Sequence, residues 1–323
     1  DLKNIGGTIS AKTSAALDIG GDFNHRSTAY DAQNIEGKNE FIRQGIDRKA
    51  ALYVGQPLNT NNTDTDNLTT TLTIRVGGDA RLDAADISNN NGSTHLQVAG
   101  NLSLNAVKNR QLDQSVNNAD NYHKREEVRD IGSSITGLGN VNLNANQISG
   151  KAVNIESKTG DLALVAQNGI TLENGESRTS VDQGLSIKTK ALIGSKTEKT
   201  KEQWNTSESI ANQLKAGGNI ILDTQQGDIT ATHLKAQAGE NIQIHAQQGN
   251  VTLNSAMDGN SHSSTSEKKN FATYNNRQTG YIDQEVAQTQ LTAGNNVDIN
   301  AGKNIELQAN DVKAGQSIYV GNT

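Results

Sequence analysis

The residues that could do chemistry in this chain are few and scattered. Asp298, Glu306 and Asp311 lie close together in sequence, and carboxylates clustered on successive turns are the acids and bases of polysaccharide-cleaving enzymes. Each of the first two alternates with apolar neighbours, such as Val297 and Ile305, as outward positions of a strand do. This alternation indicates solvated surface positions. A carbohydrate-active enzyme, either a lyase or a hydrolase, is kept as the alternative function.

Metal-binding patterns are also missing from the sequence. The six histidines are scattered, no His-Glu-x-x-His motif occurs, and His233 and His245 lie on separate expected strands. Gly77-Gly78-Asp79 begins like a calcium-binding repeat, but the full Gly-Gly-x-Gly-x-Asp pattern does not follow. Cysteine is absent, which excludes disulfides and cysteine-ligated metals. We therefore predict that the chain is not an enzyme and has no catalytic residues, no metal site and no cofactor.

The elements that would carry such residues are defined by an internal repeat. Residues 216–222 (AGGNIIL) reappear as 238–244 (AGENIQI), and residues 225–230 (QQGDIT) reappear as 247–252 (QQGNVT). Both pairs are separated by 22 residues. A fixed period of this length is typical of a solenoid, in which each repeat buries its apolar side only against neighbouring repeats.

Within one period the apolar residues follow the two-residue rhythm of a β-strand, and Gly-Asn or Gly-Asp marks the turns. The period has room for about three short strands. If each period is one turn of a coil, Ile220 stacks under Ile242, and Asn219 and Asn241 share a corner where their amides can bond along the axis. The same reasoning places Ile318 over Val297, Leu222 under Ile244, Ile229 under Val251 and Ala231 under Leu253. We predict an all-β fold, a parallel β-helix with about 21–22 residues per turn.

The composition fits this architecture. Only 33% of the residues are apolar and 3% aromatic, which is thin for a globular core but sufficient for a solenoid whose core is narrow. The net charge is −6 and no basic stripe with interleaved aromatic residues occurs, so a nucleic-acid partner is not expected. The sequence contains no apolar run of 18 residues that could span a membrane as a helix.

Four excursions, meaning segments that leave the repeat, interrupt the coil at about 24–67, 106–133, 173–213 and 258–288. The first contains Pro57 and the polar run 59–64, and the third carries a Ser/Thr/Lys-rich run whose alternation suits a strand pair. We predict that 1–323 is one continuous β-helix fragment from which the excursions project as antiparallel hairpins. They collect the large aromatic residues Phe41, Tyr53, Tyr122, Trp204, Phe271, Tyr274 and Tyr281. These side chains either pack on the rod or contact a partner.

The closing stretch contains three further copies of the repeat, at residues 293–299 (AGNNVDI), 301–307 (AGKNIEL) and 314–320 (AGQSIYV). The fourth excursion opens with 261–265 (SHSST), and the coil returns at 290–294 (QLTAG). Together these features resemble the haemagglutinin repeats of two-partner-secreted exoproteins, the family of filamentous haemagglutinin and the contact-dependent growth inhibition effectors. The resemblance is strongest over about 214–323.

This resemblance implies a right-handed β-helical filament, exported through an outer-membrane secretion partner and displayed on the surface of a Gram-negative bacterium. It implies a nonenzymatic, structural or adhesive segment, used in cell contact, in adhesion or in delivery of a C-terminal toxin to neighbouring cells. The expected partners outside the cell are a target-cell receptor or an outer membrane. The family brings no catalytic residues.

Overall fold

The structure is a computed structural model that describes residues 1–55, 70–190 and 194–322. Every regular element in these ranges is a β-strand. None of the described residues forms a helix long and apolar enough to cross a membrane.

Most strands belong to three parallel sheets of nine strands each, here called sheets A, B and C, which together form the rod. Sheet A contains β1 (Leu2–Ile5), β4 (Phe23–Arg26), β9 (Ala80–Asp83), β12 (Asn101–Asn105), β17 (Gln147–Lys151), β20 (Ile170–Glu173), β25 (Ile229–Thr232), β28 (Val251–Asn254) and β33 (Ile305–Leu307). Sheet B contains β2 (Thr8–Ala11), β7 (Ala51–Val54), β10 (Asp86–Asn89), β15 (Ser134–Gly137), β18 (Asn154–Ser157), β23 (Asn212–Ala216), β26 (Leu234–Ala238), β31 (Thr289–Ala293) and β34 (Asn310–Ala314). Sheet C contains β3 (Ala15–Ile19), β8 (Thr70–Val76), β11 (Gly92–Val98), β16 (Val141–Ala145), β19 (Leu162–Ala166), β24 (Ile220–Thr224), β27 (Ile242–Ala246), β32 (Asn296–Ala301) and β35 (Ser317–Asn322).

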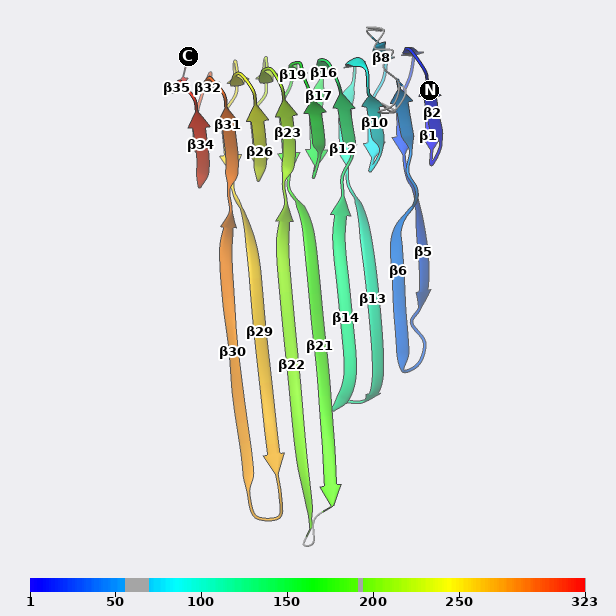
Figure 1. Cartoon of the computed structure of the whole chain (residues 1–323), viewed down its shortest axis with the longest axis vertical. Coiled ribbons are helices and arrows are strands. Elements are labelled where there is room, and N and C mark those ends of the chain that lie inside the picture. Colours follow the sequence, from blue (N-terminus) through cyan, green and yellow to red (C-terminus); the bar gives the residue numbers. More distant parts are fainter. Residues whose placement is uncertain (56–69, 191–193, 323) are drawn as a thin grey trace, which may run out of the picture.

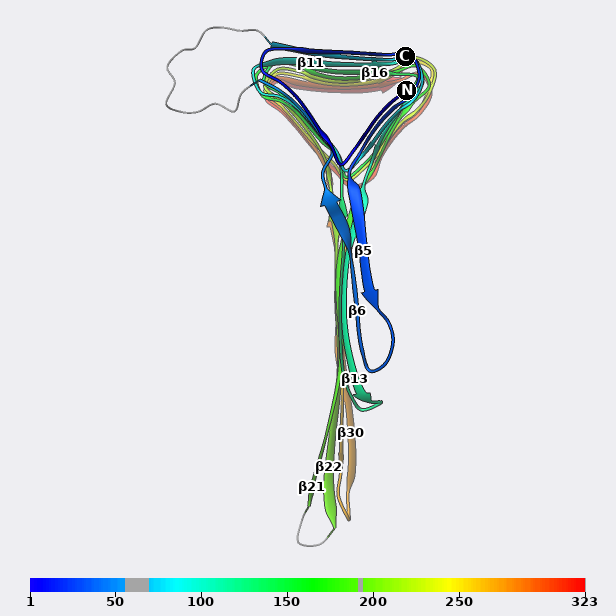
Figure 2. The same ribbon diagram turned by 90° about the vertical axis from the view of Figure 1, so that its right-hand side faces the viewer.

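The remaining strands form a single antiparallel sheet, here called the blade. It is built from four hairpins: β5 (Thr28–Asn34) with β6 (Asn39–Arg48), β13 (Val107–Asn118) with β14 (Asn121–Ile131), β21 (Gly175–Lys190) with β22 (Ser195–Ile210), and β29 (Ala256–Lys269) with β30 (Tyr274–Ala287). Figure 1 shows the hairpins side by side below the rod, and Figure 2 shows that the rod is triangular and that all four hairpins leave one of its corners. The predicted β-helix with projecting antiparallel hairpins is confirmed.

The predicted register of the rod is also confirmed. Ile220 pairs with Ile242, which in turn pairs with Val297, and Ile318 covers Val297 as expected. The other predicted pairs, Leu222 with Ile244, Ile229 with Val251 and Ala231 with Leu253, are present too. These side chains point inward and most are fully buried, so the repeat of the sequence is a repeat of core positions.

The corner between sheets B and C is held by a ladder of polar side chains. Asn241 Nδ2 donates to Asn219 Oδ1 at 2.8 Å, and Asn296 Nδ2 donates to Asn241 Oδ1 at 3.0 Å, as the shared corner predicted. The glycine of the repeat is required beside this ladder, because a Cβ on Gly239 would lie 2.0 Å from the carbonyl oxygen of Gly217. The stacking of turns therefore requires the glycine of the Ala-Gly-x-Asn motif for its lack of a side chain, and its asparagine extends the ladder.

The corner between sheets A and B alternates between two forms. The second, fourth, sixth and eighth turns emit a hairpin there, whereas the other turns close with one or two residues. Each tight corner contains one residue with positive φ: Gly6 (59°), Ala84 (45°), Ala152 (51°), His233 (49°) or Ala309 (50°). Only glycine adopts this backbone conformation without strain, so alanine and histidine must be held there by the surrounding turns.

The alternation explains why the hairpins form one continuous sheet. Turns of the rod and strands of a sheet have the same spacing, about 4.8 Å. One hairpin every second turn supplies two blade strands for every two turns of the rod. The strands of the blade are therefore spaced like the turns, and the blade is continuous. Neighbouring hairpins pair directly, β6 with β13, β14 with β21 and β22 with β29.

The first excursion is shorter than the expected 24–67. β4 and β7 belong to the rod, so the projecting hairpin extends only from Thr28 to Arg48, and Tyr53 lies on rod sheet B and not on an excursion. The error arose because the short stretch 51–54 carries no glycine or asparagine marker of the repeat. Pro57 and the run 59–64, as well as 191–193 of the third excursion, lie outside the described residues.

We predict that Leu222→Asp destabilises the rod by about 3–5 kcal/mol, because it places an unpaired charge at a fully buried position between stacked turns. The matched control is Gln237→Asp in β26, whose side chain is exposed and whose ladder neighbour in β23 is Lys215. The control should be nearly neutral. Guanidinium unfolding measures both variants, and equal losses of stability would contradict the assigned inward face.

Candidate functional site

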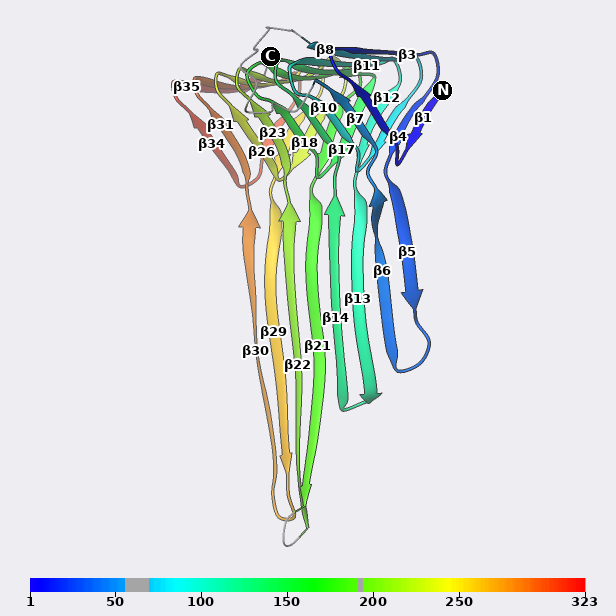
Figure 3. The same ribbon diagram turned by 45° about the vertical axis from the view of Figure 1, so that its right-hand side comes forward.

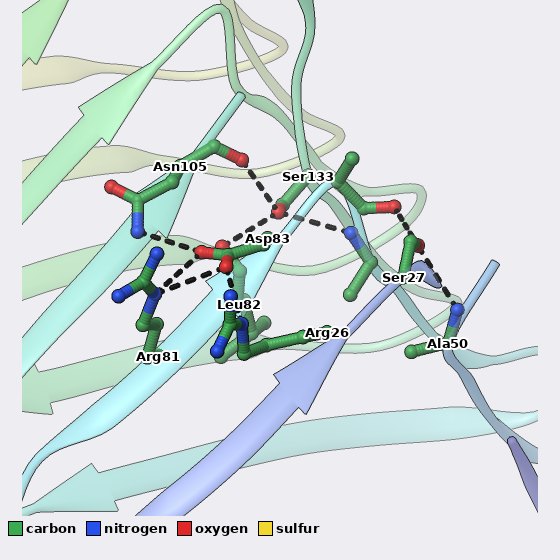
Figure 4. Close-up of polar contacts among 10 residues, drawn as sticks. Arg26, Ser27, Ala50, Arg81, Leu82, Asp83, Asn105 and Ser133 are labelled. Atoms are coloured by element: carbon green, nitrogen blue, oxygen red, sulfur yellow. Dashed lines mark hydrogen bonds and ion pairs between the residues drawn. The ribbon is translucent and has the colours of Figure 1, made fainter. Parts of the chain in front are cut away.

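The candidate site is the blade together with the corner that emits it. At this corner a buried carboxylate, Asp83, joins successive turns (Figure 4). Arg26 Nε donates to Asp83 Oδ2 at 2.6 Å, Arg81 Nε donates to Oδ1 at 2.8 Å, and Asn105 Nδ2 donates to Oδ1 at 2.8 Å. Three sheet A strands on adjacent turns, β4, β9 and β12, are thereby tied together beside the first two hairpins.

The ionisation of Asp83 follows from these contacts. Burial by itself would raise the pKa of the carboxyl, but the hydrogen bonds from Arg81, Asn105 and Arg26 outweigh it and lower the pKa of Asp83. Asp83 therefore remains charged at neutral pH. Because this buried carboxylate is paired with Arg26, Arg81 and Asn105, it fixes the local geometry of the corner.

Small polar side chains complete the emitting corner. Ser27 Oγ donates to the carbonyl of Ala84 at 2.7 Å and accepts from the backbone of Ala50 at 3.0 Å, so it bridges both ends of the first hairpin (Figure 4). At the fourth hairpin, Thr289 Oγ1 donates to the carbonyl of Asn254 at 2.7 Å and accepts from Leu234 N at 3.0 Å. The base of each of these two hairpins is therefore fixed to the neighbouring tight corner.

Aromatic residues form a row across one face of the blade. Trp204, His262 and Tyr281 occupy directly opposite positions on β22, β29 and β30. The rings of Trp204 and His262 stack with centroids 5.0 Å apart, and those of His262 and Tyr281 are tilted with centroids 5.9 Å apart. Because the stacked faces cover each other, Trp204 and His262 stiffen the blade, and Tyr281, which is 58% exposed, presents the outer end of the row.

Other aromatic side chains of the hairpins are accessible. Phe271 lies in the turn between β29 and β30 and is 82% exposed, and Tyr274 at the start of β30 is 61% exposed. Phe41 in β6 is less exposed, with the Arg43 guanidinium 6.0 Å from its ring centroid. Tyr122 in β14 is half-buried and donates from its hydroxyl to Asp182 Oδ1 at 2.9 Å. Trp204 and Tyr122 contact neighbouring strands of the blade and not the rod, so packing on the rod does not describe them, whereas Phe271, Tyr274 and Tyr281 are available for contact.

The residues considered for carbohydrate chemistry do not come together. Asp298 is in β32 on sheet C, Glu306 is in β33 on sheet A, and Asp311 is in β34 on sheet B, so they face three different directions. Asp298 instead lies beside His245 on the neighbouring turn, with Oδ2 3.3 Å from Nε2. Asp79, from the calcium-like motif, accepts from Asn101 N at 2.8 Å within a corner ladder. No group of metal-ligating side chains occurs among the residues that the structure describes.

A polar cleft that the sequence did not reveal lies where the fourth hairpin meets the rod. Its volume is about 440 Å³, and Glu208, Asp258 and Glu285 line it together with His233 and Lys235. The Ser209 hydroxyl and His233 Nδ1 share a hydrogen bond of 2.7 Å, and Ser209 N donates to Asp258 Oδ1 at 2.6 Å. The first contact fastens the base of the third hairpin to the tight corner at His233, and the second ties the third hairpin to the fourth.

The geometry defines a class of protein: a β-helical rod that carries a side sheet built from its own insertions. Comparison with known families agrees with this description, since residues 192–282 match the family model of the hemagglutinin repeat. The matched stretch runs from the third hairpin through two rod turns into the last strand of the blade. No curated protein and no solved structure matches the chain.

The chain therefore contains a hemagglutinin-repeat region, which confirms the resemblance drawn from the repeats. The hemagglutinin repeat is a structural and adhesive family and not a family of enzymes. Its members are generally secreted through outer-membrane partners and are associated with the cell surface.

The buried His233 predicts how the hairpin base responds to acid. Burial, and secondly the charge of Lys235, lower the pKa of His233 below its ordinary value, whereas Asp258 opposes the shift. The unfolded chain therefore binds a proton before the folded chain does, and stability falls as the pH drops below about 6.5. His233→Asn retains a residue that tolerates positive φ and should reduce this loss. Guanidinium unfolding at pH 7.5 and 5.5 measures it.

The loss will not vanish in this variant, because burial also lowers the pKa of His25 in β4, whose ring is fully buried. His25→Asn provides the second half of the comparison, and the double variant should show the smallest dependence on pH. Identical losses of stability in all four proteins would contradict a role for these two histidines.

Proposed function

We propose that this chain is a nonenzymatic adhesive segment of a bacterial surface filament, in which the rod is the scaffold and the blade makes the contacts. The observation that carries the proposal is the continuous blade, which projects from one corner of the rod and exposes Phe271, Tyr274 and Tyr281. Aromatic side chains of this kind concentrate binding energy in protein interfaces. Rod positions are constrained by the repeat, whereas hairpin positions are free to vary in sequence.

The hemagglutinin-repeat match supports the setting of the filament, which belongs to the same proposal. We place the segment on the outer surface of a Gram-negative bacterium, reached through an outer-membrane secretion partner. There it would serve contact with neighbouring cells, in adhesion or in the delivery of a toxin carried elsewhere in the full-length protein. The separation of Asp298, Glu306 and Asp311 on three sheets supports this proposal over a carbohydrate-active enzyme.

Excision of the fourth hairpin tests the proposal, and the tight corners supply its design. In the turn below, His233 alone joins the last residue of β25, Thr232, to the first residue of β26, Leu234. One turn higher, Asn254 stacks on Thr232 and Thr289 stacks on Leu234, so a single residue can join them too. Deletion of 256–288 with Ser255→Gly should therefore close this corner like its neighbour, because glycine accepts the positive φ. We expect the β-rich circular dichroism spectrum and cooperative melting to persist and attachment to target cells to fall strongly.

The matched control removes the hairpin at the opposite edge of the blade. Deletion of 28–49 with Ser27→Gly leaves two residues between Arg26 and Ala51, as Ala84 and Ala85 do between Asp83 and Asp86. This variant should attach nearly normally, because the exposed aromatic residues remain. Equal attachment by both deletions and the intact chain would overturn the proposal, and a fourth-hairpin deletion that no longer folds would make that hairpin part of the scaffold.

A further inference from the structure

The far end of the blade differs in charge from the rest of the protein. The third and fourth hairpins reach farthest from the rod (Figures 1 and 3). Their outer parts, residues 185–190, 194–201 and 266–279, contain eight basic and two acidic residues, a net charge of +6 in a chain whose net charge is −6. The carboxylates Glu208, Asp258 and Glu285 lie at the opposite end, beside the rod. The far end of the blade is thus basic, whereas three carboxylates line the cleft where the third and fourth hairpins meet the rod.

The same tip exposes apolar side chains. Leu185 and Ile187 in β21 are 56% and 51% exposed, and Phe271 in the adjacent turn is 82% exposed. The two hairpin ends lie close together, because a Cβ built on Gly194 would be 3.5 Å from Phe271 Cβ. Side chains alternate along a strand, so Leu185 and Ile187 lie on one face of the blade and Lys188 and Lys190 on the other. These side chains therefore surround the far end of the blade on both faces, and with Phe271 and the other lysines of residues 185–190, 194–201 and 266–279 they are here called the tip patch.

Several lysines of the tip patch have no acidic partner. Within the described residues, Lys199 pairs with Asp120 at 2.6 Å and Lys196 pairs with Glu198 at 2.9 Å, whereas Lys188, Lys190 and Lys269 make no ion pair. Their side chains are exposed at the ends of β21 and β29. Unpaired lysines are available to an anionic partner without loss of an internal contact.

We propose that the tip patch binds the phosphate-bearing headgroups of an anionic lipid membrane. Charge alone would suit any polyanion, but exposed Leu185, Ile187 and Phe271 among lysines fit the boundary between headgroups and acyl chains, where apolar side chains insert and lysines reach the phosphates. An anionic surface attracts the basic far end and repels the carboxylates of the cleft beside the rod, so the blade meets the membrane with its tip. Strands of 16 residues at about 3.3 Å per residue hold the rod about 50 Å from the membrane. This inference rests on the proposed role of the blade as the contact surface.

Vesicle binding by the intact 323-residue chain tests the inference. The probes are vesicles of phosphatidylcholine with and without phosphatidylglycerol, assayed by co-sedimentation at low and high salt. We expect binding only to the phosphatidylglycerol vesicles, and weaker binding at high salt because the charges are exposed. Replacement of Lys188, Lys190, Lys268 and Lys269 by Gln should weaken binding by two to three orders of magnitude, at about fivefold per lysine.

Two controls separate the tip from total charge. Replacement of the exposed rod lysines Lys3, Lys12, Lys215 and Lys303 by Gln changes the net charge equally and should leave binding intact. Replacement of the four tip lysines by Arg should also preserve it. Equal binding by the tip and rod Gln variants would overturn the inference.

Lipid is distinguished from a soluble polyanion by the apolar side chains. Ile187→Ser with Phe271→Ser should weaken vesicle binding and leave binding of dextran sulfate unchanged. If this variant binds vesicles like the intact chain, or if the intact chain binds dextran sulfate but no vesicle, the lipid assignment is wrong. Vesicles carry no cellular receptor, which separates the two proposals. If the chain does not bind vesicles but its attachment to cells still depends on the fourth hairpin, only this inference is overturned. If the chain binds vesicles but its attachment to cells does not depend on the fourth hairpin, only the proposed function is overturned.

Discussion

The parallel backbone ladder between successive turns is the interaction on which the rest of this structure depends. Each turn of the rod buries its apolar side chains only when the turns above and below complete the core and accept its hydrogen bonds. Ile220, Ile242, Val297 and Ile318 form one continuous column on sheet C because of this requirement. The same dependence on neighbouring turns holds at a corner of the rod. There, side-chain amides of successive turns hydrogen-bond to one another, from Asn296 to Asn241 and from Asn241 to Asn219.

The blade inherits its order from the rod. Hairpins leave one corner at every second turn, and two antiparallel strands occupy the same height as two turns. Tight corners at Ala84, Ala152 and His233 each lie between two turns that emit a hairpin, and each holds one residue at positive φ. Buried polar groups such as Asp83 and Thr289 then fix the base of the hairpins, so that a thin single-layered sheet is held by a rigid scaffold.

The blade differs along its length, and we propose that its contacts are made by its far end. Near the rod the blade carries Glu208, Asp258 and Glu285, its middle is stiffened by the Trp204 and His262 stack, and its far end exposes lysines with Leu185 and Phe271. In the proposed membrane contact, this difference in charge turns the far end toward the anionic surface. The repeat serves the stacking of turns, and we propose that the hairpins, which are free of the repeat, serve contact.

The sequence by itself determined the rod. A period of 22 residues, alternation of apolar residues and glycine next to asparagine are local signals, and they identified the stacked pairs of the central turns and the hemagglutinin-repeat family. It also marked most of the hairpins, because a break in the period is visible along the chain. It misplaced Tyr53, since four residues without a turn marker cannot be recognised as a rod strand.

Only the tertiary structure decided how the hairpins join. The pairing of β22 with β29, like that of β14 with β21, links segments that share no sequence repeat. No local sequence signal therefore predicts it. Alanine and histidine give no sign of positive φ, because strain at Ala84 or His233 is imposed by neighbouring turns and not by the residue itself. The contact of Arg26 with Asp83, 57 residues later, and the meeting of Gly194 with Phe271 at the tip likewise arise only when the turns are stacked at their common spacing.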